Sequence, residues 1–198
     1  AAGTGRVGCA RSRGAGVQTY PTYAGVNEIS YTEDWLYIRS TNLASYIMGP
    51  WYGNLARTNL FINYPANQAV IYRFPRDPVD PATFTPKSIT GGGPIGYMVD
   101  GVAMFDSRDA FSYDPGTGNE VNGAGDWNRD AYVNESQTFD AGFAHQAGAR
   151  YHYHANTPAL RHQLGDSVDY DAATNTYTEN FNGDHSPIIG WVRDGIPV

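Results

Sequence analysis

The sequence predicts a mainly β fold, sandwich- or barrel-like, with antiparallel sheets, Asp-Gly hairpins, long loops and one or two short helices. Three observations favour this class. The 198 residues include 23 glycines, 12 prolines and 15 tyrosines; apolar residues occur in short β-branched and aromatic runs; and Asp-Gly twice separates two such runs. Frequent glycine and proline imply many turns and few long helices. The length suits one large domain.

Individual elements follow from local patterns. Residues 35–40 (Trp-Leu-Tyr-Ile-Arg-Ser) and 69–74 (Ala-Val-Ile-Tyr-Arg-Phe) lie between polar or proline-rich stretches and predict strands. Residues 157–164 predict a short helix, because a Thr-Pro pair suits its start and a glycine follows its end. Residues 114–130 are rich in Asn, Gly and Asp and predict a surface loop.

Similarity between two segments of the sequence gives the strongest indication of topology. Residues 94–104 (Pro-Ile-Gly-Tyr-Met-Val-Asp-Gly-Val-Ala-Met) resemble residues 187–198 (Pro-Ile-Ile-Gly-Trp-Val-Arg-Asp-Gly-Ile-Pro-Val). Both predict β-hairpins, with Asp100 or Asp194 and the following glycine in a type I′ turn. Two similar hairpins suggest paired sheets with a pseudo-symmetric relation. Because the second one ends soon after its turn, we expect the natural chain to continue past Val198.

The charge distribution and composition limit the classes of molecule that the protein is expected to bind. Residues 1–98 carry eight Lys or Arg against five Asp or Glu, whereas residues 99–198 carry five against fifteen, and all five histidines lie in that acidic half. Lys87 is the only lysine. Phosphate binding needs clustered Lys and Arg, so we expect no nucleic-acid partner, and a cation is the more natural ligand. No apolar run approaches the roughly 20 residues that span a bilayer.

The chain divides into a Gly- and Ala-rich N-terminal arm, residues 1–25, which we expect to be flexible, and one β-rich domain, residues 26–198. A start at Ala-Ala-Gly without Met fits a mature product after removal of a signal peptide, so we expect a secreted, periplasmic or cell-surface protein. The single Cys9 excludes an internal disulfide and leaves a free thiol or a bridge to another chain.

The histidines carry the clearest chemical signal. Residues 151–154 read Tyr-His-Tyr-His, so on a strand His152 and His154 share one face and the two tyrosines share the other. If the four residues before Arg150 form a hairpin loop, His145 pairs with Arg150 and joins the histidine face. A loop of odd length would break this parity.

Three neutral imidazoles with a carboxylate such as Asp140 form the ligand set expected for zinc, copper or a similar ion, and three protein ligands leave one position open. Asp140 is then a fourth ligand or orients a ligand, and His185 is a further candidate for either role. The alternative is that the histidines make structural hydrogen bonds in the core. Calcium is a second candidate ion for residues 114–130, which offer oxygen donors without the spacing of an EF-hand.

At these residues the chain resembles the YHYH domain family, over roughly residues 30 to 198. The resemblance rests on these segments: residues 94–102, Phe139 with Asp140 and His145, residues 151–154, residues 160–166, and residues 185–198. It implies a bacterial exported protein whose relatives continue past the last hairpin and whose activity is not established. Asp100 departs from the pattern, since many relatives carry Asn there, and both residues suit a turn.

The sequence therefore predicts an exported protein with a histidine-rich transition-metal site at His145, His152 and His154. It leaves open whether the site is catalytic, hydrolytic or redox, and on which substrate. The rival reading is a non-catalytic surface, matrix or glycan-binding module. Candidate partners are a glycan, a small-molecule substrate or further copies of the chain.

Overall fold

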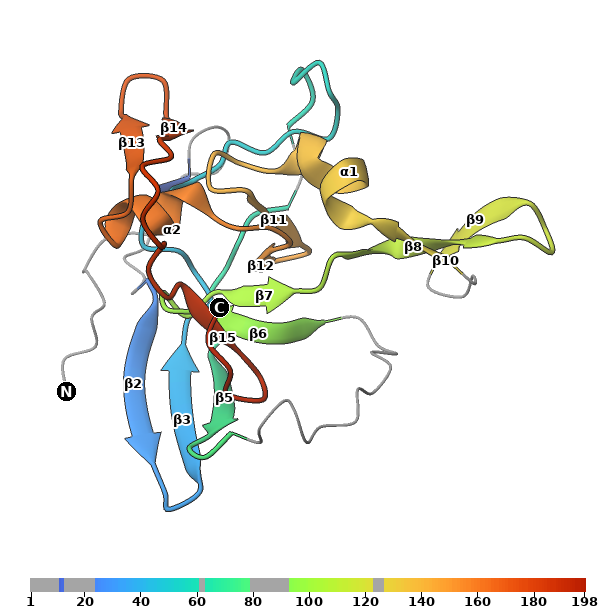
Figure 1. Ribbon diagram of the computed structural model, residues 1–198. Coiled ribbons are helices and arrows are strands. Elements are labelled where there is room, and N and C mark those ends of the chain that lie inside the picture. The colour runs from blue at the N-terminus through green and yellow to red at the C-terminus, as the bar shows by residue number, and fades with distance from the viewer. Residues whose placement is uncertain (1–10, 13–23, 61–62, 79–92, 123–126) are drawn as a thin grey trace.

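The computed structural model describes residues 11–12, 24–60, 63–78, 93–122 and 127–198 (Figure 1). The predicted N-terminal arm lies almost entirely outside these residues, and so does Cys9. In the described part strands predominate, the sheets stay open and none closes into a barrel. No helix there is long and apolar enough to cross a membrane.

The central sheet has five strands in the order β11-β12-β7-β6-β15. Its strands are β6 (Pro94–Met98), β7 (Ala103–Phe105), β11 (Ala144–Ala147), β12 (Arg150–Tyr153) and β15 (Gly190–Val192). Within this sheet, β12 and β7 are the one parallel pair. The amide of Asn42 bridges these two strands, because its Nδ2 donates to the Tyr151 carbonyl at 2.6 Å and its Oδ1 accepts from the Ala103 N–H at 2.9 Å.

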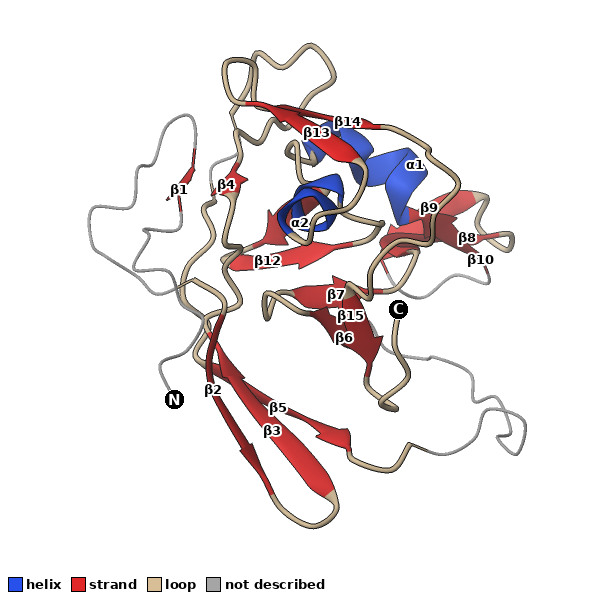
Figure 2. Ribbon diagram, turned by 60° about the vertical axis from the view of Figure 1, so that its left-hand side comes forward, coloured by secondary structure: helices blue, strands red, loops and turns tan. Residues whose placement is uncertain are grey.

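Smaller sheets surround this one (Figures 1 and 2). A three-stranded sheet contains β2 (Val26–Tyr31), β3 (Trp35–Ser40) and β5 (Val70–Pro75) in that order. The strands β8 (Arg108–Asp114), β9 (Asn119–Asn122) and β10 (Trp127–Asp130) form an arm that projects from the rest of the chain in Figure 1. The remaining strands are β1 (Arg11–Ser12) with β4 (Ile47–Met48), and β13 (Val168–Asp171) with β14 (Thr176–Glu179).

Two short helices complete the fold. The helix α2 (Pro158–Gln163) has Thr157 as its N-cap, which accepts from the Leu160 N–H, and Gly165 follows its end with a φ of 83°. This confirms the predicted start and stop. The helix α1 (Ala131–Glu135), capped by the Asp130 side chain, continues into the 3-10 turn η2 (Ser136–Thr138).

Two local predictions need correction. Strand β3 has the predicted bounds, whereas β5 begins and ends one residue later than expected. Residues 114–130 are not one long loop: they contain a turn, where Gly118 takes a φ of 70° and donates to the Asp114 carbonyl, and then β9 and β10. The Asn, Gly and Asp residues there mark the turn of a hairpin.

The two Asp-Gly hairpins share one geometry, although it is not the type I′ turn. Of Asp100 and Gly101 only Gly101 takes a positive φ, 79°, and the Met98 N–H donates to the Val102 carbonyl across a three-residue loop. Such loops combine a type I turn with a left-handed glycine. The Asp100 carboxylate accepts from the Val102 N–H at 3.1 Å, which holds Asp100 in the type I position.

The hairpins also lie in one sheet and not in two. Strand β15 pairs with β6 antiparallel, with Trp191 opposite Tyr97, and the returning segment bonds back to β15 through Val198 and Gly190. Gly96 permits this close approach, because a Cβ there would meet the Trp191 carbonyl oxygen at 2.5 Å. The two similar segments, residues 94–104 and 187–198, therefore form neighbouring hairpins of the central sheet.

The core lies on the tyrosine face of β12. The hydroxyls of Tyr151 and Tyr153 both contact the Tyr46 hydroxyl, at 2.9 and 2.7 Å. Tyr151 also donates to Asp140 at 2.6 Å, and Tyr153 to Asp100 at 3.1 Å. Apolar side chains close around this network: Leu43, Met48, Trp51, Met98, Val102, Met104, Ala159, Leu160 and Ile189. The two tyrosines of the Tyr-His-Tyr-His segment are therefore structural.

The buried Asp100 makes stability depend on pH. Burial raises the pKa of Asp100 from 3.8 to about 6, against its hydrogen bonds from Val102 and Tyr153. Between these values the folded chain holds a proton that the unfolded chain releases, so stability falls as the pH rises through this window. The cost to the folded state above pH 6 is on the order of 3 kcal/mol.

Asp100→Asn is therefore expected to stabilise the chain at alkaline pH, because Asn keeps an acceptor for Val102 and cannot ionise. Urea unfolding measured at several pH values checks this. Wild type should lose stability as the pH rises through the window, and the variant should lose about half as much, since Asp140 titrates similarly. Equal pH profiles for the two chains would contradict this account of Asp100.

Candidate metal centre

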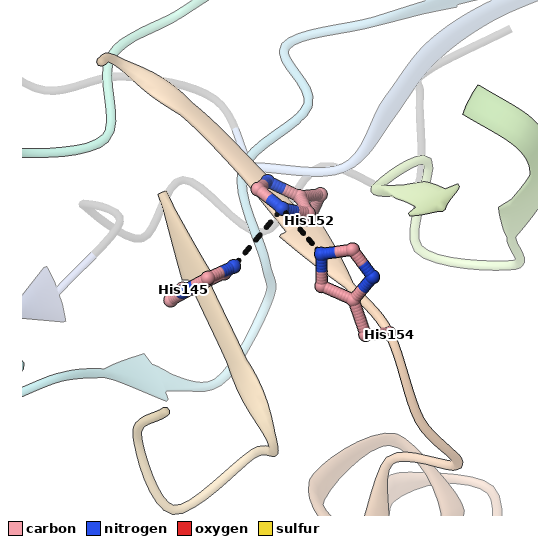
Figure 3. A group of neighbouring side chains, drawn as sticks. All are labelled: His145, His152 and His154. Carbon is pink, nitrogen blue, oxygen red and sulfur yellow. Dashed lines mark hydrogen bonds between the residues drawn. The ribbon is translucent and has the colours of Figure 1, made fainter. Parts of the chain in front are cut away.

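Three histidines meet on one face of the central sheet (Figure 3). Because side chains alternate along β12, this face is opposite that of Tyr151 and Tyr153. The hairpin of β11 and β12 places His145 directly across from His152, and His154 follows two residues later. The Nε2 atom of His152 lies 3.1 Å from that of His145 and 3.1 Å from that of His154. All three candidate ligand atoms lie within 4.8 Å of one another.

The hairpin register differs from the expected one. Ala147 pairs with Arg150, so the loop has two residues and His145 faces His152 instead of Arg150. Gly148 begins the loop with a φ of 61°, as the primed hairpin turns require. The observed loop has two residues and the expected loop had four. Both lengths are even, so His145 lies on the same face of the sheet as His152 and His154 in either case.

Each ring is fixed through its other nitrogen. The Nδ1 of His152 contacts the Arg150 carbonyl at 3.1 Å, and that of His154 contacts the Asp106 carbonyl at 2.6 Å. The Nδ1 of His145 contacts the Thr138 hydroxyl at 2.7 Å. These contacts orient all three Nε2 atoms toward one point, as outer partners of metal-binding histidines commonly do.

The hydrogen-bond partners also assign the protons. Carbonyl oxygens only accept, so His152 carries its proton on Nδ1. The Thr138 hydroxyl gives its one hydrogen to the Glu135 carbonyl at 2.6 Å, and so it accepts from Nδ1 of His145. Burial, with a smaller effect of His154, lowers the pKa of His145 to about 3, and burial also holds the pKa of His152 well below 6.5. Both rings are therefore neutral at pH 7, with bare Nε2 lone pairs.

The contact between His145 and His152 thus brings two lone pairs together at 3.1 Å with no proton between them. Such a contact is repulsive unless a cation lies between the nitrogens. The site is also shielded from water, since the side chains of His145 and His154 are only 9% and 5% exposed. Phe105 stacks on His152 with ring centroids 4.1 Å apart, and Phe139 meets His145 edge-on at 4.9 Å.

A carboxylate faces the same point. Oε2 of Glu135 lies 3.1 Å from Nε2 of His145 and 3.5 Å from Nε2 of His154. Burial, together with the hydrogen bond with Asp109, raises the pKa of Glu135 from 4.5 to about 7. A proton on Glu135 would satisfy its contact with His145 but not the contact between His145 and His152.

The arm supports Glu135 from behind. Asp109 on β8 is bonded to the Glu135 carboxyl, and it is also paired with Arg129 of β10 through Nε at 2.7 Å and through a terminal nitrogen. Arg129 also pairs with Glu120 of β9. All three strands of the arm therefore contribute to the position of one carboxylate.

Of the five site residues predicted from sequence, the structure brings together three. Asp140 lies on the tyrosine side, where its carboxylate accepts from the Gly49 N–H at 2.8 Å, the Gly142 N–H at 2.9 Å, the Ala144 N–H at 3.3 Å and the Tyr151 hydroxyl at 2.6 Å. His185 is exposed, with its Nδ1 at 2.6 Å from the Ser186 carbonyl, outside the cluster.

The candidate calcium segment shows no comparable gathering. Asp114 caps its own turn through Gly116 and Thr117, Glu120 pairs with Arg129, and Asp130 caps α1. Among the described residues, the histidine cluster is the one group of three or more potential ligands that comes together. Residues 123–126, within this segment, lie outside the described part.

Sequence reasoning missed Glu135. It is the last residue of a five-residue helix, too short for a periodic pattern, in a segment without a predicted element. The available signal was Asp130, an N-cap residue type directly before Ala-Tyr-Val-Asn-Glu. A helix that begins after Asp130 ends at Glu135, whose side chain lies beside His145 of the histidine hairpin.

Fold and site together define a β-rich protein with a buried three-histidine cluster and one adjacent carboxylate. The family model described as YHYH protein matches residues 71–198, which is more than half of the chain and includes every residue of the cluster. The chain belongs to the YHYH family. Searches of curated proteins and of solved structures found no match.

Proposed function

We propose that the chain binds one divalent transition-metal ion through the Nε2 atoms of His145, His152 and His154, with Glu135 as a fourth donor. The observation that carries this is the 3.1 Å contact between two unprotonated nitrogens in a buried site. A cation turns that repulsion into two bonds. It also gives the Glu135 carboxylate an opposite charge.

Donor spacing and chemistry agree with such an ion. Ligands about 2.1 Å from one ion lie roughly 2.9 to 3.4 Å apart at neighbouring octahedral or tetrahedral positions. The two Nε2 separations from His152 fall in this range, and the Nε2 atoms of His145 and His154 lie within 4.8 Å of each other. Imidazole nitrogen with one carboxylate suits zinc and copper better than calcium or magnesium, which prefer oxygen ligands. Zinc and copper are therefore the proposed ions.

The surrounding residues have separable tasks. Thr138 and the carbonyls of Arg150 and Asp106 orient the imidazoles, while Phe105 and Phe139 exclude water from two sides. Glu135 is placed to ligate or to accept a proton from a bound water. A metal held here would supply Lewis-acid or redox chemistry. The exported location remains a prediction from the sequence, which leaves catalysis and the substrate open.

The rival proposal is a structural module in which the histidines only make hydrogen bonds. The Nδ1 contacts with two carbonyls and one hydroxyl fit that role equally well. The Nε2 contacts do not, because hydrogen bonding leaves His145 and His152 without a proton to share. A metal centre accounts for both sets of contacts.

Calorimetric titration of chelator-stripped chain with Zn²⁺ and with Cu²⁺ tests the proposal. Wild type should bind one equivalent of at least one ion, and His154→Ala should weaken binding at least about hundredfold. His162→Ala is the matched control, because His162 bonds to the Val168 carbonyl away from the cluster. Absence of saturable binding in wild type, or equal losses in both variants, would sink the proposal.

A further inference from the structure

A second site lies away from the histidines, between the edge strand β5 and the strands β6 and β15. Here the chain forms a pocket of about 370 Å³, within the range of small-molecule sites. Two arginines, Arg73 and Arg193, line it with three tyrosines, Tyr37, Tyr72 and Tyr97. In a chain of net charge -7, two cations in one pocket run against the overall charge.

Arg73 is held ready for a ligand. It lies opposite Tyr37 in the pairing of β3 with β5, and its guanidinium stacks over the Trp35 ring at 4.1 Å. Stacking occupies the faces of the guanidinium and leaves its N–H edges free for a planar acceptor. Within the described part of the chain, no carboxylate lies within ion-pair distance of Arg73.

Arg193 approaches from the turn after β15. Its backbone N–H donates to the Ile95 carbonyl at 2.8 Å, which fixes the turn against β6. Burial raises the pKa of Tyr97, while the charges of Arg193 and Arg150 oppose that rise, so both cations act on the Tyr97 hydroxyl. Arg193, like Arg73, has no carboxylate partner among the residues that the structure describes.

The tyrosines form a rigid wall with unused polar groups. The rings of Tyr72 and Tyr97 stack with centroids 3.5 Å apart and an interplanar angle of 2°. The hydroxyls of Tyr37, Tyr72 and Tyr97 have no hydrogen-bond partner in the described ranges. A phenol hydroxyl both donates and accepts, which suits the hydroxyl groups of a sugar.

We propose that this pocket binds a sugar acid, a carbohydrate unit that carries a carboxylate. The fork geometry of Arg73 and Arg193 matches the carboxylate, and the three tyrosine hydroxyls match the ring hydroxyls. A neutral sugar would leave the arginines unpaired, and inorganic phosphate would leave the tyrosines unused. The pocket shares no residue with the histidine cluster, so the sugar-acid proposal can be tested independently of the metal proposal.

Calorimetric titration with galacturonate and with a short oligogalacturonate tests this site and distinguishes a free sugar acid from an acidic glycan. At least one of them should bind saturably to wild type, whereas galactose should not bind and phosphate should not displace the ligand. Arg73→Gln/Arg193→Gln should weaken binding at least roughly tenfold. Arg57→Gln is the matched control, because Arg57 is exposed and, as Arg73 does over Trp35, lies over an aromatic ring, that of Tyr52, outside the pocket.

Unchanged circular dichroism and metal content in the double variant would show that its fold is intact. If that variant unfolds, Arg193→Gln alone gives the same readout with less perturbation. The proposal is overturned if neither sugar acid binds wild type, if phosphate or galactose binds as well, or if Arg57→Gln loses as much affinity as the pocket variants.

Discussion

Adding zinc or copper to the chelator-stripped chain is expected to raise its free energy of unfolding by about 4 kcal/mol when the free ion exceeds Kd a thousandfold. The reason is that the ligand cluster exists only in the folded hairpin of β11 and β12. The unfolded chain holds His145, His152 and His154 apart from Glu135, and so it binds the ion weakly. Thermal unfolding with and without the ion measures the effect.

The double variant His152→Ala/His154→Ala supplies the control. It removes two of the three nitrogens and the repulsive contact with His145, so the ion-free variant should fold and should gain no stability from the ion. An equal gain in wild type and variant would place the binding elsewhere. No gain in wild type would contradict a folded metal centre.

The second large effect is expected from Asp140→Asn, which should lower the free energy of unfolding by about 3 kcal/mol at pH 5 and by less at alkaline pH. Four groups donate to this buried carboxylate: the N–H groups of Gly49, Gly142 and Ala144 and the hydroxyl of Tyr151. An amide offers one acceptor oxygen and turns an NH₂ group toward donors. Burial raises the pKa of Asp140 to about 6, so at alkaline pH the variant also removes the cost of ionising this carboxylate, which offsets part of the loss.

Asp171→Asn is the comparison, because Asp171 also accepts from one N–H group and one hydroxyl but is exposed. Its cost should stay below about 1 kcal/mol. Where Asp140→Asn remains folded, it should still bind metal, because its carboxylate lies on the tyrosine side. A variant that loses the metal at full stability would instead make Asp140 a ligand.

The histidine face could be predicted because it depends on local geometry. A strand alternates its side chains, so His152 and His154 had to share a face once residues 150–153 formed β12. His145 joined them through loop parity, and this survived an error in the loop length. The short helix α2 was predictable for a similar reason, since Thr157 and Gly165 mark its ends locally.

The fourth donor could not be predicted because it depends on the path of the chain. Asp140 is closer in sequence to His145 than Glu135 is, yet it turns toward the tyrosines and Glu135 toward the histidines. The 3-10 turn η2 lies between Glu135 and Asp140 and separates the directions of the two side chains. The arm carrying Asp109 and Arg129, which fixes Glu135, lies in a segment whose composition indicated only a loop.

The turn type was missed for another reason. Asp-Gly is compatible with two hairpin loops, and the sequence does not choose between them. In the first hairpin a hydrogen bond from the Val102 N–H to the Asp100 side chain supports the observed loop. The placement of both hairpins in one sheet likewise requires close backbone contact at Gly96, which no sequence repeat reveals. The similarity of the two segments indicated that both form hairpins, but it did not indicate that the two hairpins lie next to each other in one sheet.

Elemental analysis of the purified chain by mass spectrometry, alongside the His152→Ala/His154→Ala variant, tests the central claim most directly. The proposed centre predicts about one equivalent of a single transition metal in wild type, zinc or copper, and its loss from a variant that still folds. A wild-type chain that is metal-free, and stays empty after incubation with either ion, would contradict the metal centre and leave the histidines as structural groups.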